Sequence, residues 1–475
     1  MYRKPDRNQL NLDEFILPFG GKLSAENRWV KMAEIIPWEM IEDYYAESFR
    51  NEKPDGNPPI PARIAFGAIH IKENEDITDR RTVDNISENP YMQYFLGLKT
   101  FRSEPLFDPS MMVHFRKRFP AEFIDKVNEE IYRRMKPPEP PGGGKGGGLK
   151  NAGTMILDAT AAPADIRYPT DISILDECRM NTEKMIDEIW AYTKREGHKT
   201  SYSRRKARSE YLKIIKQRRH KAGEIKEAVR QQLIYVRKNL ETLERLMAET
   251  SKPLMKKRLL RLEVIYKVVK QQAEMLDEDK HIVEDRIVSL RQPHVRPIKR
   301  GKIGRPVEFG QKLGFSVVNG FTFIDRQSWD NFNEGVTLIE SAERYREKHG
   351  FYPSVILGDG AYRNRDNLHF CKKNGIRLSG WSAAGSKNNE LDIENEQSYR
   401  DSCKRNMVES RNGIAKRRYG LDLIMTRLDY TSETEAALNV LAMNIAHVLR
   451  VLLRLIRNLR FEQIFQIKRS VLIIY

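Results

Sequence analysis

The chain has 475 residues, of which 40% are hydrophobic and 31% are charged, and its formal net charge at pH 7 is +17. This length is enough for two or three domains, and the composition is that of a folded globular chain, which excludes a disordered protein. So large a positive surplus favours a polyanionic partner, and we expect nucleic acid rather than an anionic membrane.

The chain lacks the patterns of a membrane or secreted protein. It has no run of 18 apolar residues, and its first residues, MYRKPDRNQLNLDEF, lack the apolar stretch of a signal peptide. The three cysteines, Cys178, Cys371 and Cys403, are too few and too scattered for a disulfide framework or a zinc cluster. We therefore expect free thiols, a cytoplasmic protein and no contact with a membrane.

The clearest boundary is a Pro- and Gly-rich linker at 137–150, which contains the sequence PPEPPGGGKGGG. Prolines stiffen such a segment and glycines loosen it. The N-terminal region before it, 1–136, is predicted to form short helices, one of which begins near Arg63 after three prolines. Thr78 and Ser110 are expected to cap two further helices of this region.

A basic cluster, Arg116, Lys117 and Arg118, lies on the helix that is expected to follow Ser110. Short helices with basic clusters are typical of a helix-turn-helix-like DNA-binding domain. A helical dimerisation domain with solvated basic faces fits the same spacing almost equally well. We favour DNA binding for 1–136, and the alternative stays open.

A long helical insertion is predicted over 172–294, after an expected strand at 154–160. Its two apolar stripes have steps of three and four residues and are separated by a proline, which predicts an antiparallel helical hairpin. Such stripes favour a structural arm. The stripes comprise Val229, Leu233, Val236, Leu240, Leu243 and Met247, then Leu259, Leu262, Tyr266, Val269, Ala273 and Leu276.

A second basic cluster lies at 194–221, where twelve Lys or Arg residues stand against two Glu. Charge runs of this kind usually form solvated faces. Because tyrosines are interleaved and the whole chain is basic, we expect contacts with the DNA backbone here. The candidate residues are Arg204, Arg205, Lys206, Arg208, Arg218 and Arg219.

Strands and helices alternate after the insertion. A hairpin is predicted at 311–324, because Asn319-Gly320 favours a type I′ turn between two alternating apolar runs. A helix, the strand 354–358, a helix, a short strand and a basic helix over about 400–418 follow. This order is typical of an α/β ribonuclease-H-like mixed sheet. We assign 151–171 and 295–430 to that catalytic core.

The segment 431–475 is predicted to form an apolar C-terminal helix. Ser432 and Glu435 have the spacing of a capping box at its start. Such a helix is most often part of a core, so we expect burial here rather than membrane insertion.

Two aspartates follow buried-looking strands, Asp158 after Ile156 and Leu157, and Asp359 after Gly358. An acid at such a position either caps a turn or binds a ligand. Carboxylates that converge from distant segments can hold the divalent ions that phosphodiester chemistry needs. Without a metal ion, such a cluster would repel itself. Two aspartates at similar positions of one sheet therefore favour a ligand pair.

A third acid, Glu409, lies on the predicted basic helix. Arg405, Glu409, Asn412 and Lys416 are spaced four, three and four residues apart, so they share one helical face. Glu409 would then point to the metal ions, and the basic residues to phosphates. Ordinary surface pairing of Glu409 with Arg405 explains the spacing as well. Glu409 is therefore a candidate metal ligand only in combination with the two aspartates.

Several blocks of the sequence resemble bacterial insertion-sequence DDE transposases, and the similarity is greatest to the insertion-sequence-five group. The family's R-(3)-E-(6)-K spacing, in which the numbers count the intervening residues, is present at Arg405, Glu409 and Lys416. The blocks are ILDATAAPADIRYPTDISIL at 156–175, GRPVEFGQKLGFSVVNGF at 304–321, ILGDGAYRNRDN at 356–367 and RNMVESRNGIAKRRYGL at 405–421, with ENPYMQYFLGL at 88–98 and PSMMVHFRKRF at 109–119.

The resemblance implies an enzyme in which Asp158, Asp359 and Glu409 bind two Mg²⁺ or Mn²⁺ ions. It implies cleavage at the ends of a mobile element and joining of the freed 3′-hydroxyl to target DNA. Arg405, Lys416 and Asn412 would contact phosphates, and the N-terminal helices would read the terminal inverted repeats. Two ends must be brought together, which implies a homodimer on double-stranded DNA near the bacterial nucleoid.

The chain departs from the family pattern at Ser402, where the broader signature has a tyrosine three positions before the arginine. Trp381, on a loop, is a candidate for stacking on an extruded base, with simple packing as the alternative. Two other functions stay open: a domesticated, non-catalytic DNA-binding protein, and another ribonuclease-H-like nuclease. A purely structural coiled-coil role is supported only by the helical insertion.

Overall fold

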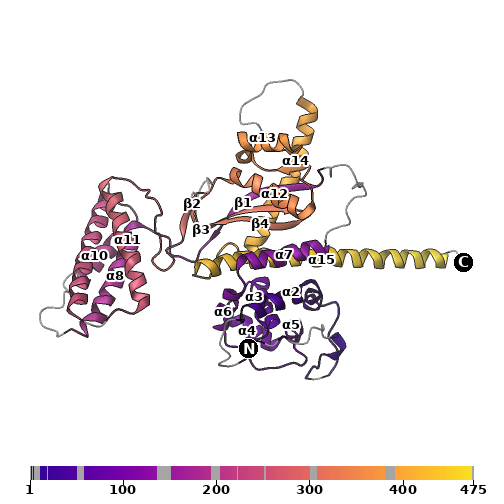
Figure 1. Ribbon diagram of the computed structural model, residues 1–475, viewed down its shortest axis with the longest axis horizontal. Helices are drawn as coiled ribbons and strands as arrows, with labels where there is room; N and C mark the ends of the chain where they lie inside the picture. Colours follow the sequence, from indigo (N-terminus) through magenta and orange to yellow (C-terminus); the bar gives the residue numbers. More distant parts are fainter. Residues whose placement is uncertain are drawn as a thin grey trace. The chain divides into compact units, whose positions relative to one another are not determined.

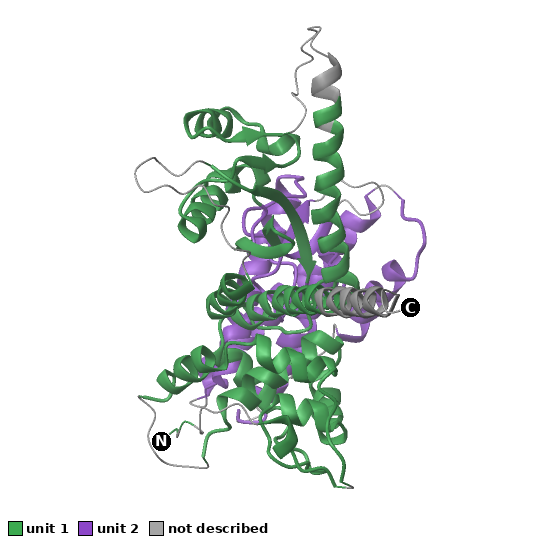
Figure 2. Cartoon of the chain, turned by 90° about the vertical axis from the view of Figure 1, so that its right-hand side faces the viewer, with its two compact units in different colours: residues 1–163, 312–328, 332–475 green, residues 164–311, 329–331 purple. Residues whose placement is uncertain are grey.

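The computed structural model describes residues 2, 4, 11–18, 20–50, 58–135, 151–193, 204–221, 223–250, 253–299, 307–379 and 391–472 (Figure 1). The predicted linker 137–150 and Trp381 lie outside these residues. The chain forms two compact units (Figure 2). Unit 1 comprises 1–163, 312–328 and 332–475, and unit 2 comprises 164–311 and 329–331.

The N-terminal part of unit 1 consists of short helices, as expected. Thr78 caps α4, since its Oγ1 accepts a hydrogen bond from the Arg81 amide. Ser110 was predicted to cap α6 in the same way, but its side chain makes no capping bond, because Asp108 organises that turn by accepting from the Ser110 amide. The helices are α1 (Arg28–Ile35), α2 (Trp38–Glu47), α3 (Ala62–Glu75), α4 (Asp79–Glu88), α5 (Pro90–Phe95), α6 (Met111–Arg118) and α7 (Ala121–Met135).

Six strands form a mixed sheet in the order β2-β3-β1-β5-β6, with β4 paired to β3. The β3–β4 hairpin turns at Asn319 and Gly320, both with positive φ (50° and 81°), which confirms the predicted type I′ geometry. Pairs β1–β5 and β5–β6 are parallel. The strands are β1 (Thr154–Pro163), β2 (Arg296–Lys299), β3 (Val307–Val318), β4 (Phe321–Ser328), β5 (Val355–Leu357) and β6 (Arg377–Leu378).

Three helices and two 3-10 turns complete the surroundings of the sheet. They are the turn η2 (Glu334–Thr337), α12 (Leu338–His349), the turn η3 (Gly360–Tyr362), α13 (Arg365–Lys373) and α14 (Leu391–Arg418). The mixed α/β architecture agrees with the predicted class.

The long helix α15 (Asp429–Leu472) forms the centre of unit 1 and lies beside α7 (Figure 1). Over Asp429–Arg454 its length and composition would allow it to cross a membrane, but 67% of its most apolar window is buried within the described chain. Its contacts with α3, α6, α7 and β4 identify this stretch as a core helix, as expected.

The predicted capping box at the start of α15 is wrong. The helix begins three residues earlier than Ser432, whose hydroxyl donates to the Thr426 carbonyl oxygen. Glu435 is buried, accepts from Lys72 of α3 at 2.8 Å and also bonds the Thr426 amide. Glu73, next to Lys72 on α3, accepts from the same ammonium group, so this buried lysine is paired with two carboxylates and joins α3 to α15 through Glu435.

Unit 2 is mainly a helical bundle. The first predicted stripe is confirmed, because Val229, Leu233, Val236, Leu240 and Leu243 are buried on α10. The second stripe is wrong at two positions: Leu259 and Tyr266 are exposed. On α11 the buried face runs through Leu262, Ile265, Val268 and Met275, because α10 and also α8 cover it. The helices are α8 (Asp171–Trp190), α9 (Arg204–Ile215), α10 (Glu224–Glu249) and α11 (Lys256–Asp277).

Candidate active site

Parallel pairing of β1 with β5 brings the two predicted aspartates to the same end of the sheet. Ile156 pairs with Leu357, and each aspartate lies two residues further along its own segment. Asp158 therefore has the same orientation on β1 as Ile156, while Asp359 follows the end of β5. Both carboxyl groups are partly exposed.

The turn that holds Asp359 is tightly packed. Its carboxylate accepts a hydrogen bond from the Ala361 amide at 2.9 Å and so caps η3. Gly358 permits the turn, because a Cβ there would lie only 2.7 Å from the ring of Tyr362. Tyr362 is buried, and its hydroxyl interacts with the side chain of Thr337. Sequence and packing thus fix Asp359 at the strand end.

Helix α14 joins the site through one apolar contact and one polar contact. Val408 packs with Ile156 and Leu357 in a small buried cluster. One turn further along α14, the Asn412 amide donates to Asp158 Oδ2 at 2.6 Å. Asn412 is a member of the face of α14 that the sequence analysis assigned to the site.

The last acid, Glu409, lies on α14 between Arg405 and Asn412. Its side chain is exposed and makes no hydrogen bond or ion pair with the residues that the structure describes. Arg405 is near enough to Asp158 to favour its ionised form. Lys416 is partly buried one turn beyond Asn412.

Asp158 has the perturbed acidity expected of a functional carboxyl group. Burial raises its pKa to about 6, and the charges of Glu334 and Asp359 add to this rise. The Ala159 amide and the Arg405 guanidinium act in the opposite direction. A carboxyl group that is partly desolvated beside other acids is costly for folding, which is a frequent property of catalytic sites.

Glu334 is a neighbour of this site that the sequence analysis missed. It follows Asn333, whose side chain caps η2, and its carboxylate lies 3.2 Å from Lys312 Nζ. Gly335 brings the turn against η3, because a Cβ there would meet the Ala361 carbonyl oxygen at 2.3 Å. Long-range packing of η2 against η3, together with the Asn367 hydrogen bond to the Gly335 carbonyl oxygen, connects Glu334 with the aspartates, so no local pattern could have indicated it.

The donor chemistry fits a divalent oxygen-binding metal ion. Asp158 and Asp359 supply carboxylates, and the buried carbonyl oxygen of the Asn412 side chain has no hydrogen-bond partner among the described residues. Within those residues, however, no three His, Cys, Asp or Glu side chains are close enough to enclose a metal ion. Convergence of Asp158, Asp359 and Glu409 on one ion therefore stays a prediction.

The N-terminal basic cluster is only partly available to DNA. Arg116 is 3% exposed and bonds both oxygens of Asp79 through its two terminal nitrogens, so the predicted phosphate contact is not open to it. Arg118 donates to Ser48 Oγ and stacks over Phe49. Lys117 alone of the three is exposed.

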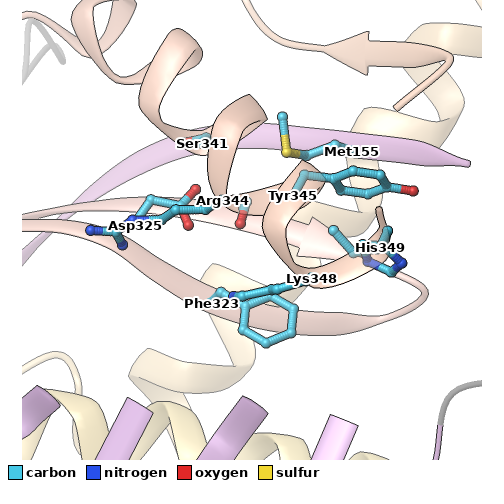
Figure 3. Close-up of a pocket in the computed structure, with 10 residues that line it drawn as sticks. Met155, Phe323, Asp325, Ser341, Arg344, Tyr345, Lys348 and His349 are labelled. Carbon is cyan, nitrogen blue, oxygen red and sulfur yellow. The ribbon is translucent and has the colours of Figure 1, made fainter. Parts of the chain in front are cut away.

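A small cavity in unit 1 lies away from these residues. Figure 3 shows its walls, which include Asp325, Ser341 and Lys348. Its volume is about 10 Å³, enough for roughly one water molecule. None of the predicted site residues borders it, and burial raises the pKa of Asp325. The cavity is a feature of the core and not a substrate site.

Two protein-family models match parts of the chain. Residues 18–118 match a family described as a transposase domain (DUF772), and residues 356–446 match a transposase DDE domain. The second match contains Asp359 and Glu409, whereas Asp158 lies outside both matches.

The chain is also similar to a protein of Rhizobium meliloti that is described as uncharacterized protein ORF8 in nfe locus. The two are 28% identical over 145 residues, which cover 30% of this chain and 64% of that relative. The similarity thus spans less than two thirds of the relative. No solved structure matches the chain.

Proposed function

Because its two matched domains make this chain an insertion-sequence DDE transposase, we propose that it cuts the ends of its element and joins them to target DNA. The insertion-sequence-five group is compatible with these matches. The sheet order, with a hairpin on one side of β1 and parallel strands on the other, supports a ribonuclease-H-like core.

One observation carries the proposal. Asp158 and Asp359 lie at the same end of two paired parallel strands, and the helix that bears Glu409 is attached to Asp158 by the Asn412 hydrogen bond. Two aspartates from distant segments thus lie at one end of the sheet, and we propose that Glu409 joins them, an arrangement that a domesticated DNA-binding protein would not need. The alternative of another ribonuclease-H-like nuclease shares this geometry, and the transposase matches favour transposition.

In this proposal Asp158, Asp359 and Glu409 hold two Mg²⁺ or Mn²⁺ ions. When bound, such ions supply Lewis-acid stabilisation of the charge that develops on the phosphoryl oxygens. Asn412 orients the Asp158 carboxylate through its amide. Arg405 and Lys416, which flank Glu409 on α14, would bind the phosphates on either side of the cut.

DNA recognition is assigned to the N-terminal helices, which would read the inverted repeats as double-stranded DNA. Lys117 is the exposed member of their basic cluster. Two element ends must react together, so we propose a homodimer in the complex with DNA. The reaction would take place in the cytoplasm, at the nucleoid.

The test is a cleavage assay on duplex DNA that carries an element end, with Mg²⁺. Asp158→Asn, Asp359→Asn and Glu409→Gln should each reduce cleavage by at least about a thousandfold and leave DNA binding unchanged. Asp422→Asn is the control, because Asp422 is exposed and has no partner among the described residues. Normal cleavage by Glu409→Gln would remove Glu409 from the site.

A second readout does not depend on activity. Mg²⁺ should raise the melting temperature of the wild-type chain and of Asp422→Asn, but not that of Asp158→Asn, because bound ions stabilise only a chain that can hold them. Equal stabilisation of the Asp158→Asn variant would place the metal ions elsewhere.

A further inference from the structure

A groove between α8 and α9 of unit 2 is rich in cations. Its volume is about 370 Å³, and it is lined by Arg179, Met180, Glu183, Lys184, Asp187, Arg204, Arg205 and Arg208. Five of these eight side chains are basic and two are acidic. Arg204, Arg205 and Arg208 belong to the basic run 194–221, and the other lining residues come from α8.

Two of the five cations are already neutralised and form the wall of the groove. Arg204 bonds both carboxylate oxygens of Asp187, at 2.9 and 3.0 Å, and so fixes the start of α9 to α8. Arg179 is buried and pairs with Asp176 and Glu183. The acids of the groove are therefore occupied, and neither arginine is free for a ligand.

The other three cations have no such partners. Lys184, Arg205 and Arg208 are exposed and make no hydrogen bond or ion pair with the residues that the structure describes. Arg205 and Arg208 are three residues apart on α9, so they share one helical face. Lys184 contributes a third charge from α8. Three unpaired cations thus line one concave surface that internal ion pairs hold in shape.

We propose that Lys184, Arg205 and Arg208 form a binding site for the phosphodiester backbone of double-stranded DNA. The inference rests on the proposed function, because a transposase must hold more DNA than its catalytic centre contacts. Arginine pairs well with phosphate through its planar, forked donors. A concave groove with one apolar lining residue, Met180, suits a convex, rod-like polyanion better than a flat lipid surface.

Basic residues that are neighbours in the sequence differ in whether they line the groove and are free to bind DNA. Arg204 is paired with Asp187 in the wall of the groove, whereas Lys206 does not line the groove and has its ammonium 3.9 Å from Glu210. Contacts with the backbone alone carry no sequence information, so this groove should strengthen binding to any duplex. Arg218 and Arg219 are exposed beyond the end of α9 and do not line the groove.

The experiment measures binding of the full chain to a duplex of unrelated sequence over a range of salt concentrations. Each phosphate contact contributes about 0.9 to the slope of log affinity against log salt. Arg205→Gln with Arg208→Gln should lower that slope by about 2 and weaken binding roughly tenfold or more at 0.1 M salt. Lys206→Gln, on the same helix but outside the groove, should change neither quantity.

The outcomes are distinct. If the double variant keeps the wild-type slope, or if Lys206→Gln lowers it equally, the groove is not a DNA site, although end cleavage can still stand. If the double variant instead loses binding to vesicles of anionic phospholipid while its DNA affinity is unchanged, the partner is a membrane and the proposal is overturned. Circular dichroism would check that the variants fold, which is expected because both arginines are exposed.

Discussion

Replacing Asp158 by asparagine should stabilise the folded chain at neutral pH. Burial and the charges of Glu334 and Asp359 raise the pKa of this carboxyl group from 3.8 to about 6. The folded state therefore favours the protonated acid, and ionisation above pH 6 costs folding free energy. Asparagine keeps an oxygen that can accept the Asn412 hydrogen bond, so the substitution removes the charge with little change in contacts.

The size of the stabilisation follows from the rise in the pKa of Asp158. About two pK units at 1.36 kcal/mol each give at most about 3 kcal/mol at pH 7.5, and partial exposure of the side chain reduces this value. The cost of Asp158 to the folding free energy decreases as pH falls through 6 towards 4, so about half of this cost should remain at pH 5. For a unit of this size, 3 kcal/mol corresponds to a rise of roughly 4 °C in melting temperature.

Thermal melts of the wild-type chain and of Asp158→Asn at pH 7.5 and pH 5, without divalent ions, would measure this difference. Asp422→Asn provides the matched control, with no shift expected at either pH. An Asp158→Asn variant that melts below the wild type at pH 7.5, or whose gain is the same at both pH values, would refute the electrostatic reasoning.

Three further predictions concern the buried ion cluster of α3 and α15 and the turns beside the candidate active site. Lys72→Met should destabilise the chain by about 3–5 kcal/mol in urea melts, because it removes the ammonium group that bonds the buried side chains of both Glu73 and Glu435, and a loss below 1 kcal/mol would contradict this. Gly335→Ala should cost about 1–3 kcal/mol and impair cleavage, since its Cβ would collide with Ala361, whereas Gly360→Ala has open space and should be tolerated in both assays. Glu334→Gln should lower the pKa of Asp158, so the acid limb of the pH–rate profile should move to lower pH; an unchanged limb would show that Glu334 does not act on Asp158.

Local patterns predicted much of the fold, because strands, turns and caps depend on neighbouring residues. The Asn319-Gly320 turn, the Thr78 cap and the buried stripe of α10 are confirmed for that reason. The aspartates could be paired in advance because both follow apolar strands. Where the sequence failed, a distant partner was decisive: Glu435 matches a capping box locally but binds Lys72 of α3.

Surface chemistry was the least predictable property. Arg116 and Lys117 are adjacent in the sequence, yet one is buried against Asp79 and the other is exposed. Leu259 and Tyr266 fit a heptad, but the additional helix α8 changes which face of α11 is covered. Glu334 begins the short 3-10 turn η2, which has no periodic sequence pattern. In each case the outcome depends on contacts between segments that sequence spacing does not record.

The ion cluster of Lys72, Glu73 and Glu435 affects how the domains of this chain can be dissected. A fragment that begins after the N-terminal helices would keep Glu435 on α15 but lack its ammonium partner, and it would also lose the apolar cover that α3, α6 and α7 provide. Such a fragment would be prone to aggregate whether or not those helices touch DNA. End recognition is therefore better mapped by point substitutions such as Lys117→Gln than by truncation.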